Sequence, residues 1–208
     1  MLARALPADV GNRLARLFLG LIVMGVSIAL MVRSELGLAP WDVLHQGVSE
    51  RTRVPLGVVT VLLGALVLGL WIPLRQRPGV GTLANAVVIG LVIDVVLALV
   101  PEIGWAPLRW VMMPAGVVGM ALGSGYYIGA GLGPGPRDGL MTGLAARGGS
   151  LRLIRTAIEA TALIAGIGLG GTVGIGTVLL AASIGPLIQY FLGRLTLPAR
   201  TAPSLCAS

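Results

Sequence analysis

Residues 36–44 read LGLAPWDVL, and residues 132–140 read LGPGPRDGL. At an offset of 96 positions the two stretches match at five places: leucine, glycine, proline, aspartate and a second leucine. The chain has only four aspartates, and two of them, Asp42 and Asp138, coincide within a Pro-x-Asp motif. The sequence therefore predicts an internal duplication.

A second pair of motifs extends the match toward the carboxyl end of each copy. Gly-Val-Gly-Thr at 79–82 is matched by Gly-Ile-Gly-Thr at 174–177, at an offset of 95. We define repeat 1 as residues 14–100 and repeat 2 as residues 110–195, within a single membrane domain that spans 1–208. We expect residues 196–208 to form a flexible cytoplasmic tail.

The composition is that of a membrane protein. The chain is 56% hydrophobic and 11% charged, with a mean hydropathy of +0.94. About twenty apolar residues cross a hydrocarbon core of roughly 30 Å, so apolar runs near this length predict spans. The runs are 17–32, 54–74, 83–100, 110–128, 153–169 and 177–193. We predict an all-α polytopic membrane protein with six transmembrane helices, three in each repeat.

The arginines predict the orientation of the chain. All fifteen basic residues are arginine. They lie between the apolar runs, except for Arg155 at the cytoplasmic end of the fifth, so we assign them to topology and expect no nucleic-acid partner. With the amino terminus inside, eleven fall in cytoplasmic segments and four outside. This count predicts both termini in the cytoplasm of a bacterial plasma (inner) membrane, with the first run retained as an anchor.

An odd number of spans in each copy has a consequence for symmetry. After three spans the chain has changed sides, so the second copy enters the membrane from the face opposite to the first. We therefore predict two inverted three-helix repeats, the plan of many secondary transporters.

Each repeat also holds one short segment, 39–52 in the first and 135–148 in the second. Each opens with Ala-Pro or Gly-Pro, and an aspartate follows two residues after the proline. Proline suits the first helical turn, and aspartate can cap free N–H groups there. A helix of about ten residues is too short to span. Either a re-entrant half-helix or a helix lying at the interface fits this length.

Six stretches carry a family pattern: LGLAPWDVL at 36–44, GVGTLAN at 79–85, GPRDGLM at 135–141, RTAIE at 155–159, GGTVGIGT at 170–177 and IGPLIQ at 184–189. Together they resemble the YczE/YyaS/YitT group of bacterial integral membrane proteins, most closely its YczE members. The resemblance covers residues 14–195. It implies a bacterial inner-membrane protein and names no substrate.

Charged side chains inside predicted spans are the first candidates for function, because a charge at the centre of a span costs about 2.5–3.5 kcal/mol on insertion scales. Asp94 lies in the third predicted span. Arg155 and Glu159 lie one helical turn apart in the fifth, so they can pair. One interpretation is an ion or proton relay, or a polar anchor for a solute. The other is a structural pair that fixes helix register, and for Asp94 the sequence names no partner.

The short segments supply three more candidates. Asp42 and Asp138 act as helix caps, as ligands near the ends of half-helices, or as both. Arg137 has Trp41 as its counterpart in repeat 1, which is the main difference between the copies. A buried Arg137 would hold a carboxylate or phosphate, whereas an exposed Arg137 would anchor the cytoplasmic interface.

The Gly-x-Gly-Thr motifs predict helix starts near the repeat interface. Thr82 and Thr177 can cap these helices, and Asn85 follows one turn later in repeat 1, so all three are candidate solute contacts. His45 is the only histidine and has no cysteine or carboxylate cluster around it in the sequence, so we expect no metal site. No HExxH, GxSxG or P-loop motif occurs, and the Gly-x-Gly-x-x-Gly match at 166–171 lies in an apolar run with no strand before it. We therefore expect neither a cofactor nor an enzyme.

These features lead to one main function and one alternative. The main prediction is a permease or secondary transporter of an unidentified small solute. The alternative is a non-transporting membrane scaffold or accessory protein for another complex. The expected partners are the lipid bilayer and the solute, and a homo-oligomer is allowed.

Overall fold

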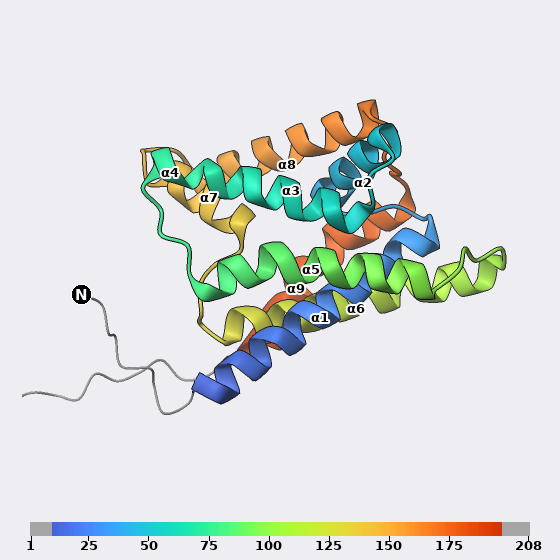
Figure 1. Cartoon of the computed structure of the whole chain (residues 1–208), viewed down its shortest axis with the longest axis horizontal. Coiled ribbons are helices and arrows are strands. Elements are labelled where there is room, and N and C mark those ends of the chain that lie inside the picture. The colour runs from blue at the N-terminus through green and yellow to red at the C-terminus, as the bar shows by residue number, and fades with distance from the viewer. Residues whose placement is uncertain (1–9, 197–208) are drawn as a thin grey trace, which may run out of the picture.

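The structure, a computed structural model, describes residues 10–196, and every regular element in that range is a helix (Figure 1). The all-α prediction is confirmed. In chain order the helices are α1 (Val10–Ser34), α2 (Pro40–Thr52), α3 (Leu56–Gly69), α4 (Trp71–Leu74), α5 (Val80–Leu99), α6 (Ala106–Gly129), α7 (Pro136–Ala145), α8 (Leu151–Gly168) and α9 (Ile175–Leu195). Beyond Thr196, the predicted tail lies outside the described residues.

Within residues 10–196, five helical segments are long and apolar enough to cross a membrane: Val10–Ser34, Leu56–Leu74, Val80–Leu99, Ala106–Gly129 and Ile175–Leu195. They match five of the six predicted spans, and Leu56–Leu74 combines α3 with α4. The segment predicted at 153–169 corresponds to α8, which has 18 residues and carries Arg152, Arg155 and Glu159. These three charges separate α8 from the other five, because each opposes transfer into hydrocarbon.

The antiparallel pair α1 and α6 forms the centre of the fold. Gly20 of α1 lies against Gly123 of α6, and Gly116 of α6 lies against Ser27 of α1. A Cβ added at Gly20 would lie 2.6 Å from the Gly123 carbonyl oxygen. Small residues therefore let the two backbones touch, as at many helix contacts in membranes. Residue numbers rise along α1 as they fall along α6, so the helices run in opposite directions.

Two glycines in the motif loops make equivalent contacts in the two halves. Gly37 lies against the second Gly-x-Gly-Thr motif (174–177), and Gly133 lies against the first (79–82). Their φ angles are +123° and +127°, a region that favours glycine. Each copy of the loop therefore docks on the other copy's helix start.

Backbone hydrogen bonds repeat the same exchange. The N–H of Gly176 donates to the carbonyl oxygen of Leu36 at 2.8 Å, and the N–H of Gly81 donates to that of Leu132 at 3.0 Å. The offset of 96 relates Leu36 to Leu132, and the offset of 95 relates Gly81 to Gly176, so the two bonds occupy equivalent positions in the two copies. Contacts that recur with their partners exchanged are the pattern of an isologous interface between two similar units.

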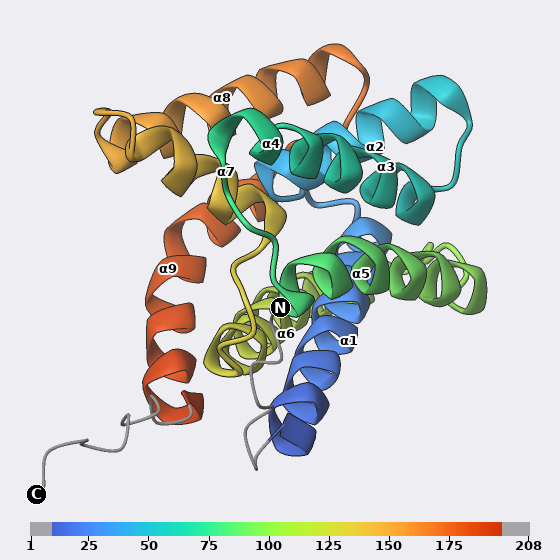
Figure 2. The same ribbon diagram turned by 60° about the vertical axis from the view of Figure 1, so that its left-hand side comes forward.

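The two halves differ where their last helices meet their neighbours. α5 packs on α1 as α9 packs on α6, but α3 also packs closely on α5, whereas α8 makes no comparable contact with α9. Figure 2 shows α8 and α9 separated, with α7 between them. One side of the molecule is therefore more open than its counterpart.

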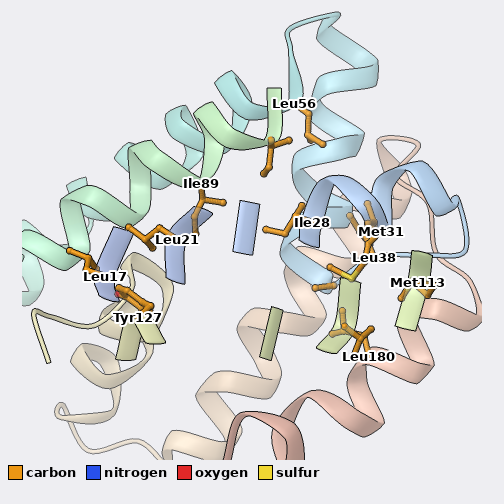
Figure 3. Packing of buried hydrophobic residues seen from close by; sticks show 14 of the residues in the cluster. Leu17, Leu21, Ile28, Met31, Leu38, Leu56, Ile89, Met113, Tyr127 and Leu180 are labelled. Carbon is orange, nitrogen blue, oxygen red and sulfur yellow. The ribbon is translucent and has the colours of Figure 1, made fainter. Parts of the chain in front are cut away.

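The buried core follows α1 and α6 through the molecule. Leu17, Leu21, Ile28 and Met31 of α1 are at most 4% exposed and pack with side chains from the other long helices (Figure 3). Large apolar side chains also cover the outside of the bundle, among them Leu62, Leu66, Leu91, Leu99, Ile164 and Val178. An apolar perimeter of this kind suits contact with lipid. The chain is an integral membrane protein with several apolar helices.

Candidate functional site

The two short helices, α2 and α7, are partly buried among the longer helices. α2 packs against α3 and α8, and α7 packs against α3, α4 and α8. Each begins at a proline, Pro40 or Pro136, whose fixed φ suits the first helical position. Their amino-terminal ends meet in the interior.

The expectation that Asp42 and Asp138 are amino-terminal cap residues is wrong in position. Ala39 and Gly135 occupy the cap positions, and neither cap makes a side-chain hydrogen bond. Because the prolines take the first helical position, each aspartate becomes the third helical residue. From there Asp138 accepts a hydrogen bond from the backbone of Gly135, so it still satisfies one free donor.

An ion pair joins the two short helices. Arg137 Nη2 of α7 lies 3.3 Å from Asp42 Oδ1 of α2. The side chain of Asp42 is 3% exposed and that of Arg137 is 31% exposed. Arg137 therefore binds a buried carboxylate from the other repeat, and its own side chain stays partly exposed in a cavity described below.

His45 and Trp41, one turn or less from Asp42, complete this cluster. The ring nitrogens of His45 lie 3.4 and 3.5 Å from Arg137 Nη2, and Nδ1 lies 3.2 Å from Thr60 Oγ1. The Arg137 guanidinium lies 5.1 Å from the centre of the Trp41 ring, within range of a cation–π contact. Aromatic and polar contacts thus hold the guanidinium in place. In the described part of the chain, Asp42 Oδ2 and Trp41 Nε1 are buried with no hydrogen-bond partner.

A cavity of about 600 Å³ lies beside this cluster. Most of its wall is apolar and comes from the long helices, including Met24, Ile28, Ile89, Met120, Leu180 and Ile184. Its charged lining comes from α7 and α8: Arg137, Asp138, Arg155 and Glu159. The cavity is therefore an apolar chamber with charge gathered on one side, where both repeats contribute.

Arg155 and Glu159 form the pair that their spacing predicted. Arg155 Nε donates to Glu159 Oε1 at 2.9 Å, but the side chains are 61% and 35% exposed. Since both line the cavity, this pair is accessible and is not a buried structural bridge. Asp138 faces the same space and is also exposed, in contrast to its counterpart Asp42.

Asp94 lies apart from the cavity. Its two carboxylate oxygens accept hydrogen bonds from the backbone N–H groups of Gly57 and Val58, at 2.6 and 3.1 Å. Those groups are at the amino-terminal end of α3, where the helix itself offers them no partner. Asp94 of α5 thus caps a neighbouring helix, which is the structural interpretation of its charge.

The two motif threonines lie at the repeat interface as expected. Thr82 Oγ1 accepts from Gly79 N–H at 3.1 Å and donates to the Pro134 carbonyl oxygen at 2.7 Å. Thr177 accepts from Gly174 N–H at 3.5 Å. Neither threonine lines the cavity. Asn85 does, and it brings an amide to the otherwise apolar α5 wall.

Sequence reasoning missed two central residues. His45 was considered only as a metal ligand, although its position three residues after Asp42 on a helix would have placed both on one face. Trp71 is 2% exposed, and its Nε1–H donates to the Pro136 carbonyl oxygen at 3.0 Å. Its ring covers Gly139 of α7. No local pattern in the sequence predicts the contact of Trp71 with α7.

The geometry defines a class: a multi-pass membrane protein whose two halves enclose a partly charged cavity. Residues 11–193 match the family described as a family of unknown function, DUF6198, and the chain belongs to that family. An uncharacterized protein of Haemophilus influenzae is 37% identical over 177 residues, which cover 85% of this chain and 81% of that protein.

Two Bacillus subtilis proteins are also similar. The uncharacterized membrane protein YczE is 33% identical over 178 residues, covering 84% of this chain and 83% of its own. The uncharacterized protein YyaS is 29% identical over 181 residues, covering 84% and 89%. The predicted family resemblance is therefore confirmed for the YczE and YyaS members. No solved structure matches the chain.

Proposed function

We propose that this protein is a permease or secondary transporter that binds a small solute in the cavity between its repeats. The observation that carries the proposal is the cavity at the meeting point of α2 and α7, one short helix from each half. Transporters built from inverted repeats bind their solutes at such places, near the ends of interrupted helices. We also propose that the protein has no catalytic activity.

Six spans with inverted halves form part of this proposal. α1 and α6 are antiparallel equivalents, and the two-fold axis that exchanges antiparallel helices is perpendicular to them. If α1 and α6 cross the bilayer, that axis lies in the membrane plane. α8 is then the sixth span, and two of its three charged residues, Arg155 and Glu159, face the cavity, where charge inside a membrane is tolerated. α2 and α7 are re-entrant half-helices.

The proposed topology has both termini in the cytoplasm of a bacterial plasma membrane. Removing Arg137 and Arg155 from the cytoplasmic count, because both line the cavity, changes eleven against four to nine against four. The excess of inside arginines is preserved.

A labelling experiment tests transport without knowing the solute. Asn85→Cys, in a background with Cys206→Ser, puts one thiol on the cavity wall. A membrane-impermeant maleimide is added to right-side-out and to inverted vesicles. An alternating-access transporter exposes this thiol to both sides over time. Glu102→Cys, in the exposed α5–α6 loop, is the control that labels from one side alone.

Labelling of the Asn85→Cys thiol from one side alone would refute alternating access. That outcome favours the non-transporting scaffold or accessory protein, which has no need to change the side on which its cavity opens.

A further inference from the structure

We propose that the cavity takes a zwitterion with an apolar body, its cationic group on Asp138 and its anionic group on Arg155. The inference rests on the proposed function, which makes the cavity a solute site, and it names the chemical class of the solute. Two sources supply this chemistry: apolar α-amino acids, and lipids whose head group carries an ammonium and a phosphate.

Asp138 offers the site for a cationic group. Its counterpart Asp42 is paired with Arg137, and Trp41 stands where repeat 2 has that arginine. Repeat 1 therefore has no arginine to give to Asp138. Among the described residues, no guanidinium lies within ion-pair distance of the Asp138 carboxylate, although it is exposed to the cavity.

Arg155 offers the site for an anionic group. Only its Nε is used by Glu159, so the two terminal nitrogens of the guanidinium are available for a bidentate contact. Arg155 and Asp138 line the same cavity, from α8 and α7, and no ion pair joins them among the described residues. A solute with both charges fits between them, each charge meeting its opposite.

The balance of charge around the cavity disfavours a solute with a single charge. Two guanidinium groups, Arg137 and Arg155, stand against three carboxylates, Asp42, Asp138 and Glu159. The amino-terminal ends of α2 and α7 each add a partial charge of roughly +0.5, which offsets the remaining negative charge. A lone anion or cation would bring an uncompensated charge into this balanced space, which is costly away from water. A zwitterion would not.

The rest of the cavity suits an apolar body. Its wall opposite the charges is formed by side chains such as Ile89, Met120, Leu180 and Ile184, with the Asn85 amide as a polar point. α8 and α9 do not pack closely on each other, and Ala181 and Gly185 of α9 are exposed on this side. An opening toward the lipid is the reason to consider an amphipathic lipid as a source.

Equilibrium binding to the full chain in an uncharged maltoside detergent tests the inference. The probe is radiolabelled L-phenylalanine, and the competitors are 3-phenylpropanoate, which lacks the ammonium, and 2-phenylethylamine, which lacks the carboxylate. We expect each competitor to bind at least about 10-fold more weakly than L-phenylalanine, because each leaves one charged partner unsatisfied. In a second arm, radiolabelled phosphatidylethanolamine in mixed micelles is the probe, and phosphatidylglycerol is its competitor.

Asp138→Asn should weaken binding of the zwitterion by about 10-fold or more and should not weaken binding of 3-phenylpropanoate. Arg155→Gln should weaken L-phenylalanine and 3-phenylpropanoate together. Glu102→Gln removes a carboxylate in an exposed loop outside the cavity and should change nothing. Binding of phosphatidylethanolamine alone, with the same dependence on Asp138, assigns the site to the lipid source.

Three results would overturn the inference: no binding of L-phenylalanine or phosphatidylethanolamine, equal binding of the singly charged analogues, or binding that is indifferent to Asp138→Asn. Because the assay measures binding alone, its failure is separate from failure of the labelling experiment. A protein that binds the zwitterion but labels from one side keeps this site and loses transport.

Discussion

Arg137 and Asp42 come from opposite repeats and are 95 positions apart in sequence, yet Arg137 Nη2 lies 3.3 Å from Asp42 Oδ1. The pair joins the first turns of two short helices that make few other contacts with one another. Its aspartate is almost fully buried, with a side chain 3% exposed. With the hydrogen bond from Trp71 to Pro136, this ion pair joins the two halves beside the cavity.

Replacing Arg137 alone should destabilise the protein. Arg137→Gln leaves the Asp42 carboxylate without its cation in the interior. Breaking a fully buried pair costs about 3–5 kcal/mol, and the partial exposure of Arg137 places the expected loss near the lower end, about 3 kcal/mol. The measurement is the free energy of unfolding in detergent, by chemical denaturation.

A double variant distinguishes the contribution of the ion pair from the contribution of Arg137 packing. Asp42→Asn with Arg137→Gln removes both charges, so it should recover at least half of the stability lost by Arg137→Gln. A double variant as unstable as the single one would mean that the guanidinium acts through packing on Trp41 and not through Asp42.

Glu159→Gln should have little effect on stability, in contrast to Arg137→Gln. The Arg155–Glu159 pair is exposed in the cavity, and exposed i,i+4 pairs contribute about 0.3–0.5 kcal/mol. The folded yield after detergent extraction should stay near that of the unchanged chain. A large loss of folded yield would support the interpretation of this pair as a structural bridge.

Gly139 should tolerate no side chain while Trp71 is present. A Cβ at Gly139 would lie 2.0 Å from Trp71 Cζ2, so the ring has to move. Gly139→Ala should cost about 1–3 kcal/mol through overpacking. Gly69→Ala, where nothing lies within 4 Å of the added carbon, is the matched control and should be neutral or slightly stabilising.

Trp71→Phe makes room for the added carbon but loses the hydrogen bond to Pro136. The cost of Gly139→Ala should therefore be smaller in the Trp71→Phe background than alone. Strict additivity of the two changes would show that the ring is not what excludes a side chain at Gly139.

The all-helical architecture and the starts of the short helices were the parts of the fold that the sequence could predict best. Each copy must build the same short helix and the same helix start, so Pro-x-Asp and Gly-x-Gly-Thr recur at nearly constant offsets. The positive φ angles at Gly37 and Gly133 explain why glycine recurs there. Local chemistry of this kind is written in neighbouring residues and can be identified from one chain.

The site was harder to predict because its partners come from different copies. Asp42 and Arg137 were both candidates, but nothing in either motif says that they meet. Asp94 was a candidate because it lies in an apolar run, and its actual partners are backbone groups of α3, which carry no side-chain signal. Exposure differs in the same way: Asp42 and Asp138 share a motif, yet only Asp138 is open to the cavity.

Replacing Asp94 should lower the stability of the protein and leave access to the cavity unchanged. Asp94→Ala removes both acceptors from the start of α3, and loss of such a cap costs about 1–2 kcal/mol. Two-sided labelling of Asn85→Cys should persist in this variant, because Asp94 is outside the cavity. Loss of that labelling in a folded variant would support the interpretation of Asp94 as part of the solute pathway.

The last prediction decides whether α8 crosses the membrane. With six spans, reporter fusions after residues 78, 148 and 205 should read inside, and fusions after 105 and 172 should read outside. α5 lies between the fusion points at 78 and 105. Its 20 residues span about 30 Å at 1.5 Å per residue, which matches the hydrocarbon core. Residues 148 and 172 flank α8 directly.

If α8 lies along the surface instead, both flanking fusions read the same side, and α9 then carries the carboxyl terminus to the outside. A fusion after residue 205 that reads outside would leave five spans, remove the inversion of the halves and with it the alternating-access mechanism.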